Sequence, residues 1–158
     1  MSLDSFSIES SADAELLASL NKDIQNQHHH MRPELFKPHN YDEILGAFKT
    51  MLTDGKMRAY VAYEDKVAIG YVLFYVNERR ESPFTYALRT VYIDQIFVND
   101  RARKGGIGSA LVEKVKDFAR ENEIKVLQLD HWTDNVLGRR FFGQAGFTYY
   151  NERMELNI

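Results

Sequence analysis

The stretch from Val91 to Gly108, VYIDQIFVNDRARKGGIG, constrains the fold and the function more than any other part of the chain. It is typical of a buried strand, then a short basic turn, then a glycine-rich loop that opens a helix. The first N–H groups of a helix lack partners and carry a partial positive charge. Glycines at positions 105, 106 and 108 let that backbone approach a ligand without a Cβ clash. The stretch therefore predicts an anion site at the start of a helix.

The basic residues of this loop support the same interpretation. Arg101, Arg103 and Lys104 stand at the helix N-terminus, where cations oppose the helix dipole. A phosphate-bearing ligand reverses that penalty. The loop is not a nucleoside-triphosphate loop, because Gly108 is not followed by lysine and then serine or threonine. A dinucleotide fingerprint needs a third glycine where Leu111 stands.

The rest of the chain predicts one mixed α+β domain over residues 1–158. A short strand around Phe6 and Ile8 precedes a helix from about Ala12 to Gln25, for which Ser10 and Ser11 offer an N-cap. The later expected elements are a helix capped by Asn40 or Asp42, strands at Met57–Glu64, Val67–Asn77 and Thr85–Val98, a helix from Ile107 to about Asn122, a strand at Ile124–Leu129, a helix at Asn135–Gln144, and one or two strands at Phe147–Leu156. The strand–helix–strand order of the second half predicts a crossover connection.

Composition narrows the classes of function. The chain has 158 residues, a net charge of −3 and no cysteine. The charge balance argues against a general nucleic-acid binder, and the lack of cysteine excludes zinc–thiolate sites and cysteine nucleophiles. No apolar run approaches the roughly 20 residues of a membrane span, and no signal peptide is evident. A cytoplasmic protein without a metal site is the expectation.

Three adjacent histidines, His28 to His30, precede a segment broken by Pro33 and Pro38. Metal ligands come from positions that converge in space, and no partner at helical spacing accompanies these histidines. We expect a solvated loop here, anchored to the core by Leu35 and Phe36 or forming one wall of a substrate pocket.

Arg103-Lys104-Gly105-Gly106-Ile107-Gly108 matches the R/Q-x-x-G-x-G/A signature of the GNAT superfamily of acyl-CoA-dependent N-acetyltransferases. Tyr92 to Val98 resembles that family's fourth strand. Asn135, followed by Phe141-Phe142 and Gly146-Phe147, resembles its later segment. The resemblance implies a bent, mostly antiparallel mixed sheet flanked by helices, with acetyl-CoA bound where two central strands splay apart.

The resemblance also implies which residues bind acetyl-CoA. Backbone N–H groups of Lys104, Gly105, Gly106, Ile107, Gly108 and Ser109, with Arg103, hold the pyrophosphate. The backbone of Ile96, Phe97 and Val98 pairs with the pantetheine arm, freed by a β-bulge in that strand. Asn135 and Phe142 touch the pantetheine side.

Asp94 is the candidate general base, because a carboxylate in an otherwise apolar central strand is costly unless it is paired or used. Alternation places it on one face with Tyr92, Ile96 and Val98 and places Gln95 on the other. Glu34 and His30 are secondary candidates. At the position where many family members carry a tyrosine acid for the thiolate, this chain has Phe142, so Tyr149, Tyr150, Tyr92 or water is left to supply the proton.

The predicted function is acetyl transfer from acetyl-CoA to a primary amine. The strand IDQIFV and the short chain resemble the diamine acetyltransferases, which favours a small polyamine or an amino-acid-like amine over a peptide amine. The alternatives are a CoA-binding sensor with little catalysis and a dinucleotide-binding module. The family resemblance also implies a homodimer. Trp132, the only tryptophan, is expected in the core, in a dimer contact or in the acceptor wall.

Overall fold

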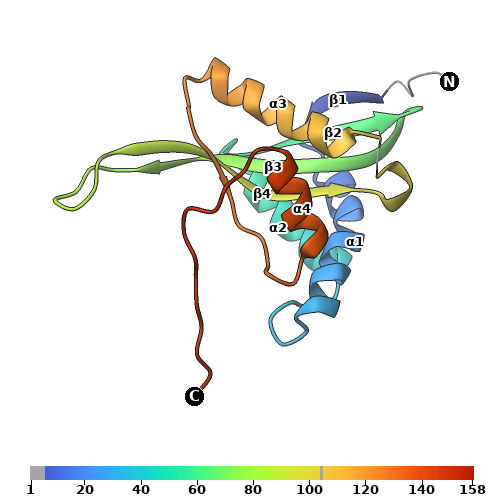
Figure 1. Ribbon diagram of the computed structural model, residues 1–158. Helices are drawn as coiled ribbons and strands as arrows, with labels where there is room; N and C mark the ends of the chain where they lie inside the picture. The colour runs from blue at the N-terminus through green and yellow to red at the C-terminus, as the bar shows by residue number, and fades with distance from the viewer. Residues whose placement is uncertain (1–5, 104) are drawn as a thin grey trace.

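The computed structural model describes residues 6–103 and 105–158 (Figure 1). A five-stranded sheet is surrounded by helices, and its elements follow the predicted order. They are β1 (Phe6–Ser11), α1 (Ala14–Met31), α2 (Tyr41–Thr53), β2 (Met57–Glu64), β3 (Val67–Arg79), β4 (Leu88–Val98), a 3₁₀ turn η1 (Asp100–Ala102), α3 (Ile107–Glu121), β5 (Leu127–Leu129) and α4 (Val136–Gln144).

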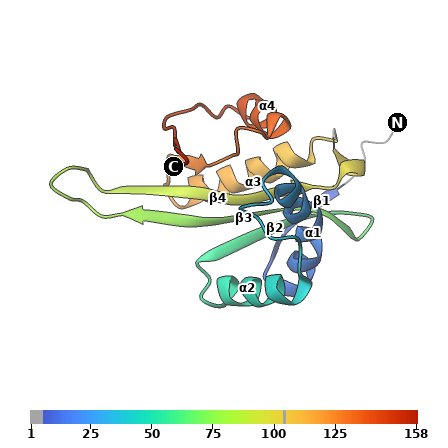
Figure 2. The same cartoon turned by 90° about the horizontal axis from the view of Figure 1, so that it is seen from below.

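The strands lie in the order β1-β2-β3-β4-β5. The first four pair antiparallel, and β5 pairs parallel with β4, as a crossover through α3 requires. This mixed, mostly antiparallel sheet confirms the predicted fold class. Beyond Tyr75, which is paired with Met57 at the start of β2, β3 and β4 continue as a two-stranded arm that projects from the body (Figures 1 and 2).

The helices divide the core into two layers (Figure 2). α3 covers one face through Ile107, Leu111 and Val115, which pack with Val72 and Phe74 of β3. On the other face α1 and α2 contribute buried side chains that pack against the alternate residues of β2 and β3; these are Leu17, Ala18 and Phe48 from the helices and Ala59, Val61, Tyr71 and Leu73 from the strands. Period-two alternation in the strands thus feeds both layers.

The first helix is longer than predicted and starts at another cap. Asp13 caps α1 by accepting hydrogen bonds from the N–H groups of Glu15 and Leu16, so Ser10 and Ser11 are not its N-cap. The helix continues through the three histidines to Met31, where the Arg32 N–H bonds the His28 carbonyl and Pro33 follows. The expected end at Gln25 and the histidine loop were therefore wrong, because polar side chains on a solvent-facing helix end resemble a loop in sequence.

The C-terminal strand predicted for Phe147–Leu156 was also wrong. Residues 147–158 form no helix or strand; they follow α4 as an extended segment (Figure 1) that contacts the rest of the chain through Tyr149 and Glu155. Met154, Leu156 and Ile158 alternate with polar residues as a strand does, but all three are fully exposed. The alternating pattern therefore indicates a tendency to form a strand, but the segment pairs with no described strand.

Candidate active site

The sheet opens between β4 and β5. Their pairing covers three residues and ends at Ile93 opposite Leu129, after which β4 continues to Val98 without β5 beside it. Further along, the Asn99 N–H bonds the Ile69 carbonyl of β3, 2.8 Å away. Because antiparallel residues alternate in direction, the backbone groups of Val98 and Ile96 point into the opening and those of Phe97 point to β3.

A β-bulge sits in β4 where the opening begins. Leu73 is opposite Gln95 and Phe74 is opposite Ile93, so Asp94 is an extra residue without a partner on β3. The sequence resemblance implied a bulge in this strand, and the structure has one. It also corrects the predicted faces, because an inserted residue shifts the alternation that follows it.

Asp94 and Gln95 therefore both belong to the face that α1 covers, and Ile96 and Val98 pack into the opposite core. The prediction that Asp94 shares a face with Ile96 and Val98, opposite Gln95, was wrong.

The environment of Asp94 suits a base. Asp94 is exposed to solvent, but the protein atoms packed around its carboxylate remove part of its hydration and raise its pKa. The neighbouring Gln95 side chain acts in the opposite direction and lowers the pKa. The rings of Tyr75 and Tyr92 lie beside it, 5.3 Å apart between centroids. Burial raises the pKa of Tyr75, and the nearby charges of Asp94 and Asp130 raise it further.

Tyr92 is held in place by a second carboxylate. Its hydroxyl donates to Asp130 across 2.9 Å. Burial, this hydrogen bond and the charges of Asp130 and Asp94 raise the pKa of Tyr92, so it stays protonated near neutral pH. The surface around Asp94 is thus aromatic and acidic.

The glycine-rich loop forms an open helix N-terminus near the end of β4. Gly106 is the N-cap of α3, with a left-handed φ of 77°, and no side chain caps this end. No acidic residue occupies the first turn of α3, and Ile107 anchors that turn in the core. A Cβ on Gly108 would lie 3.1 Å from the Phe141 ring of α4, so glycine permits the two helices to approach. Gly105 and Ser109 are exposed.

Arg103 is already engaged on the protein. Its guanidinium contacts the Asp100 carboxylate at 2.7 Å and donates to the Val98 carbonyl at 3.1 Å. The residue thus ties the loop to the end of β4 and keeps positive charge at the opening. Lys104, also predicted to contact the pyrophosphate, lies outside the described residues.

α4 presents the other two predicted contacts. Asn135 caps this helix, and its Oδ1 accepts from the Gly138 N–H at 2.9 Å. A Cβ on residue 138 would lie 2.5 Å from the Asn135 side chain, which explains the glycine there. Phe142 is 9% exposed and packs among Phe141, Phe147 and the ring of His131.

His131 is a residue whose position beside Phe142 the sequence did not reveal. Its ring stacks on Phe142 with centroids 6.0 Å apart, and its Nε2 lies 2.9 Å from the Tyr149 hydroxyl. Its Nδ1 faces the Trp132 carbonyl at 3.0 Å, so Nδ1 carries a proton. The pair of Tyr149 and His131 thus lies beside the position where the family tyrosine is missing. Only the departure at Phe142 hinted at such a substitute.

The segment between α1 and α2 packs against the end of β5. Phe36 meets Trp132 edge to face at 5.3 Å, and the Arg32 guanidinium lies 5.3 Å from the Trp132 ring. Arg32 also pairs with Glu34 at 2.6 Å and with Glu155 at 3.0 Å. The hydrogen bond from Arg32 lowers the pKa of Glu34, so this secondary candidate is held ionised.

The three histidines make separate contacts. His28 stacks on Phe36, and burial lowers its pKa. His29 bonds the Phe36 carbonyl and His30 bonds the Asn26 carbonyl, each at 2.6 Å. In the part of the chain that the structure describes, no three His, Asp or Glu side chains converge as metal ligands.

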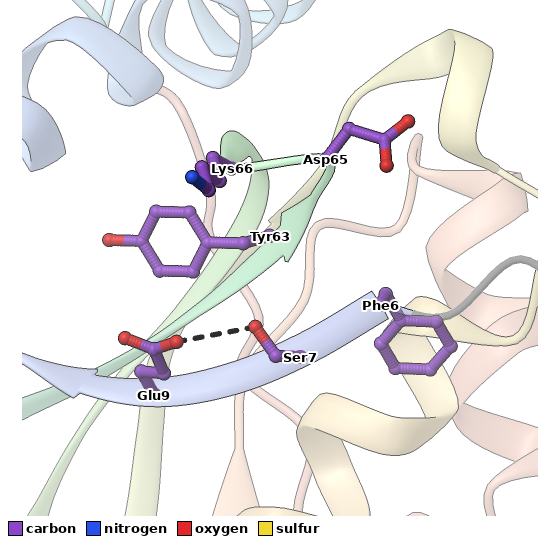
Figure 3. A pocket seen from close by; sticks show the side chains of 6 residues that line it. All are labelled: Phe6, Ser7, Glu9, Tyr63, Asp65 and Lys66. Atoms are coloured by element: carbon purple, nitrogen blue, oxygen red, sulfur yellow. Dashed lines mark hydrogen bonds between the residues drawn. The ribbon is translucent and has the colours of Figure 1, made fainter.

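Two open hollows lie away from Asp94 and the glycine-rich loop. One, of about 610 Å³, is bordered by β1 and the β2–β3 turn and is lined by Phe6, Ser7, Glu9, Tyr63, Asp65 and Lys66 (Figure 3). Its lining makes one internal hydrogen bond, between Ser7 and Glu9. The other, of about 840 Å³, lies between the C-terminal half of α3, β5 and residues 145–150. No helix among the described residues is long and apolar enough to cross a membrane.

An opened β4–β5 pair, a bulge in β4 and an uncapped glycine helix start are the features that the sequence resemblance led us to expect of an acyl-CoA-dependent acyltransferase. The chain belongs to the acetyltransferase (GNAT) family, whose model matches residues 20–147. It is therefore an N-acetyltransferase with acetyl-CoA as acyl donor.

Solved structures share this fold. The BH1408 protein from Bacillus halodurans, as a tetramutant, superposes with a TM-score of 0.89 at 21% identity, covering 96% of this chain and 99% of that one. A predicted acetyltransferase with acetyl-CoA from Clostridium acetobutylicum gives 0.73 at 20% identity, covering 97% and 96%. The aminoglycoside N-acetyltransferase AAC(6')-Iy in complex with CoA gives 0.74 at 16%, covering 98% and 95%. No curated protein matches the sequence.

Proposed function

We propose that the protein acetylates the primary amine of a small cationic acceptor, either a polyamine or an amino-acid-like amine. The observation that carries the proposal is Asp94 on the β4 bulge, where the sheet opens and its carboxylate remains exposed. The likeness of the strand IDQIFV to diamine acetyltransferases also supports a polyamine.

The surface around Asp94 suits a cation. Tyr75 and Tyr92 present two aromatic rings, and Asp130 adds a second carboxylate, bonded to the Tyr92 hydroxyl. Ammonium groups bind well over tyrosine rings and beside carboxylates. An acceptor with two amines can place one beside Asp130 and the reacting one beside Asp94.

Asp94 takes the proton of the reacting ammonium, which leaves a neutral nucleophile. A lysine-like amine has a pKa of about 10.4 in water, so it is nearly all protonated at neutral pH and needs a base. The neutral amine then attacks the thioester carbonyl directly, with no acyl-enzyme. The Ile96 N–H, which alternation directs into the opening, supports the developing oxyanion in preference to the Phe97 N–H.

The remaining backbone and side-chain contacts follow the family pattern. The N–H groups from Gly105 to Ser109 receive the pyrophosphate, with Arg103 and Lys104 adding charge. Val98 and Ile96 line the pantetheine arm. The Asn135 side-chain amide still has hydrogens to offer on its Nδ2, since its oxygen serves the α4 cap.

Tyr149 is our candidate for the acid that protonates the departing thiolate. It lies next to Phe142 through His131. When His131 is an imidazolium, Nε2–H donates to the phenol oxygen and frees the phenol proton for the thiolate. The thiolate gains that proton and Tyr149 takes the Nε2 proton, so charge and atoms balance.

An amine panel tests the proposal. Thiol release from acetyl-CoA is measured with spermidine, putrescine, lysine and a peptide with a free N-terminus. Saturable release with a polyamine or amino acid, at higher kcat/KM than with the peptide, is expected. Preference for the peptide favours the peptide amine acetyltransferase, and tight CoA binding without release for any amine favours the sensor.

We also propose a homodimer joined through the C-terminal segment. Tyr150, Met154, Leu156 and Ile158 are exposed apolar side chains with strand-like alternation, and β5 pairs with β4 alone among the described strands. If the C-terminal segment of one subunit pairs as a strand with the free edge of β5 in the other, the apolar side chains are covered and the β5 edge is paired. Light scattering of the full chain and of a variant ending at Asn151 checks this: a dimer that becomes monomeric is expected, and a monomeric full chain refutes it.

A further inference from the structure

Three polar side chains from three elements meet under the β4 bulge. They are Asn21 of α1, which is 3% exposed, Tyr71 of β3, which is fully buried, and Gln95 of β4. The Tyr71 hydroxyl donates to Gln95 Oε1 at 2.7 Å. Asn21 Nδ2 donates to the Tyr71 oxygen at 3.1 Å and to Gln95 Oε1 at 3.2 Å.

This triangle determines which way the Gln95 amide points. Two donors converge on Oε1, so the oxygen end faces the interior and the NH₂ end faces outward. With the Gln95 oxygen in this place, reversing Asn21 alone would put two carbonyl oxygens 3.2 Å apart, which is repulsive. The bulge puts Asp94 on the same face as Gln95, so the outward NH₂ end of Gln95 lies on the side of the Asp94 carboxylate, and the Gln95 side chain lowers the pKa of Asp94.

The network is costly as a purely structural device. Asn21 Oδ1 is buried without a hydrogen-bond partner among the described residues. An unsatisfied buried acceptor destabilises the fold, and apolar residues of similar shape avoid that penalty. The hydroxyl of Tyr71 sits in the same cluster as Leu17, Ala18 and Phe97, where a phenylalanine ring would also pack.

We propose that Asn21, Tyr71 and Gln95 form a positioning network for the base: they lock the Gln95 amide so that its NH₂ group holds the Asp94 carboxylate toward the acceptor amine. The inference deepens the proposed function and rests on it. None of these three side chains acts on the reacting atoms directly. Their effect passes through the orientation and the basicity of Asp94.

The three tyrosines around Asp94 do not titrate in the same range. Tyr71 and Tyr75 lie on β3 and Tyr92 on β4, and burial raises the pKa of each. Asp130, beyond β5, acts on Tyr75 and Tyr92 and is bonded to the Tyr92 hydroxyl. From α1 the contact is Asn21, which carries no charge at any pH. Asp130 is unchanged in the Gln95 and Tyr71 variants, so a change in the site-specific Asp94 titration can be assigned to the network.

The test is a ¹³C NMR titration of the Asp94 carboxyl in the full chain without substrates. Gln95→Leu removes the donor, and we expect the pKa of Asp94 to rise by about half a pH unit or more. Tyr71→Phe removes the hydroxyl that orients Gln95 and should raise it by less. Tyr60→Phe is the matched control, because Tyr60 stacks on Phe74 in the opposite core, and it should leave the Asp94 titration unchanged.

Kinetics with acetyl-CoA and spermidine give the second readout. In Tyr71→Phe the acid limb of kcat/KM should move upward with the Asp94 pKa, while KM for acetyl-CoA stays within twofold. A lowered melting temperature with an unmoved Asp94 titration in both Gln95→Leu and Tyr71→Phe overturns the inference and makes the network structural. If Tyr71→Phe does not fold, Gln95→Leu decides. A wild-type enzyme without turnover on any amine defeats the proposed function instead, and the NMR result then still stands alone.

Discussion

Asp94→Asn separates catalysis from cofactor binding at the bulge. The change replaces one carboxylate oxygen by an amide and keeps the side-chain shape. Asp94 is exposed and forms no ion pair with any described residue, so the free energy of unfolding should change by no more than about 0.5 kcal/mol. The loss of a general base costs about 100-fold to 10,000-fold in rate, which is about 3–5 kcal/mol of transition-state stabilisation.

The pH profile gives the sign of the effect. Burial raises the pKa of Asp94 above the ordinary aspartate value of about 3.9, so wild-type kcat/KM should fall as the pH falls through this raised pKa. In Asp94→Asn this acid limb should disappear, because no proton is taken up at that site.

The assay is thiol release from acetyl-CoA with spermidine, together with calorimetric binding of acetyl-CoA. We expect the Kd for acetyl-CoA to stay within twofold. Asp65→Asn is the control: it makes the same carboxylate-to-amide change in the β2–β3 turn, at a φ of 47° that asparagine tolerates. Turnover of Asp94→Asn equal to that of Asp65→Asn would falsify the role of Asp94 as base.

Other substitutions test the cofactor loop, the core and the acid. Gly106→Ala adds a Cβ at a φ of 77° and Gly55→Ala adds one at a φ of 67°, so each should lower the free energy of unfolding by about 1–2 kcal/mol. Only Gly106→Ala should weaken acetyl-CoA binding, by about 10-fold in calorimetry. Leu111→Ala, in the fully buried face of α3, should lower the free energy of unfolding in urea by about 2–5 kcal/mol. Tyr149→Phe should lower kcat about 10-fold. This is a smaller loss than removal of a typical general acid causes, because the thiolate of a thiol with a pKa of about 8.5 leaves readily. Adding Phe142→Tyr to this variant should restore most of the lost kcat. An unchanged kcat in Tyr149→Phe would show that water supplies the proton.

Local patterns in the sequence were sufficient for the elements that depend on them. Period-two alternation located β2 to β4, the apolar stripe located α3, and Asn40, one of the two caps expected for α2, caps that helix. The glycine-rich stretch after Val98 indicated an anion site, because glycines beside cations at a helix start favour a phosphate-bearing ligand, and its resemblance to the GNAT signature indicated acetyl-CoA. These features are decided within a few residues of chain.

Tertiary structure decided what depends on distant partners. The bulge at Asp94 arises from the register of β3 on β4, and it placed Gln95 on the same face as Asp94, beside Tyr71 and Asn21, which no alternation rule could show. Residues 147–158 have a strand pattern but pair with no described strand. His131 came to lie between Phe142 and Tyr149 only because the chain after β5 meets α4. The sequence by itself determined the fold class and indicated the glycine-rich loop as the candidate donor site, and the three-dimensional contacts decided which side chains lie around Asp94.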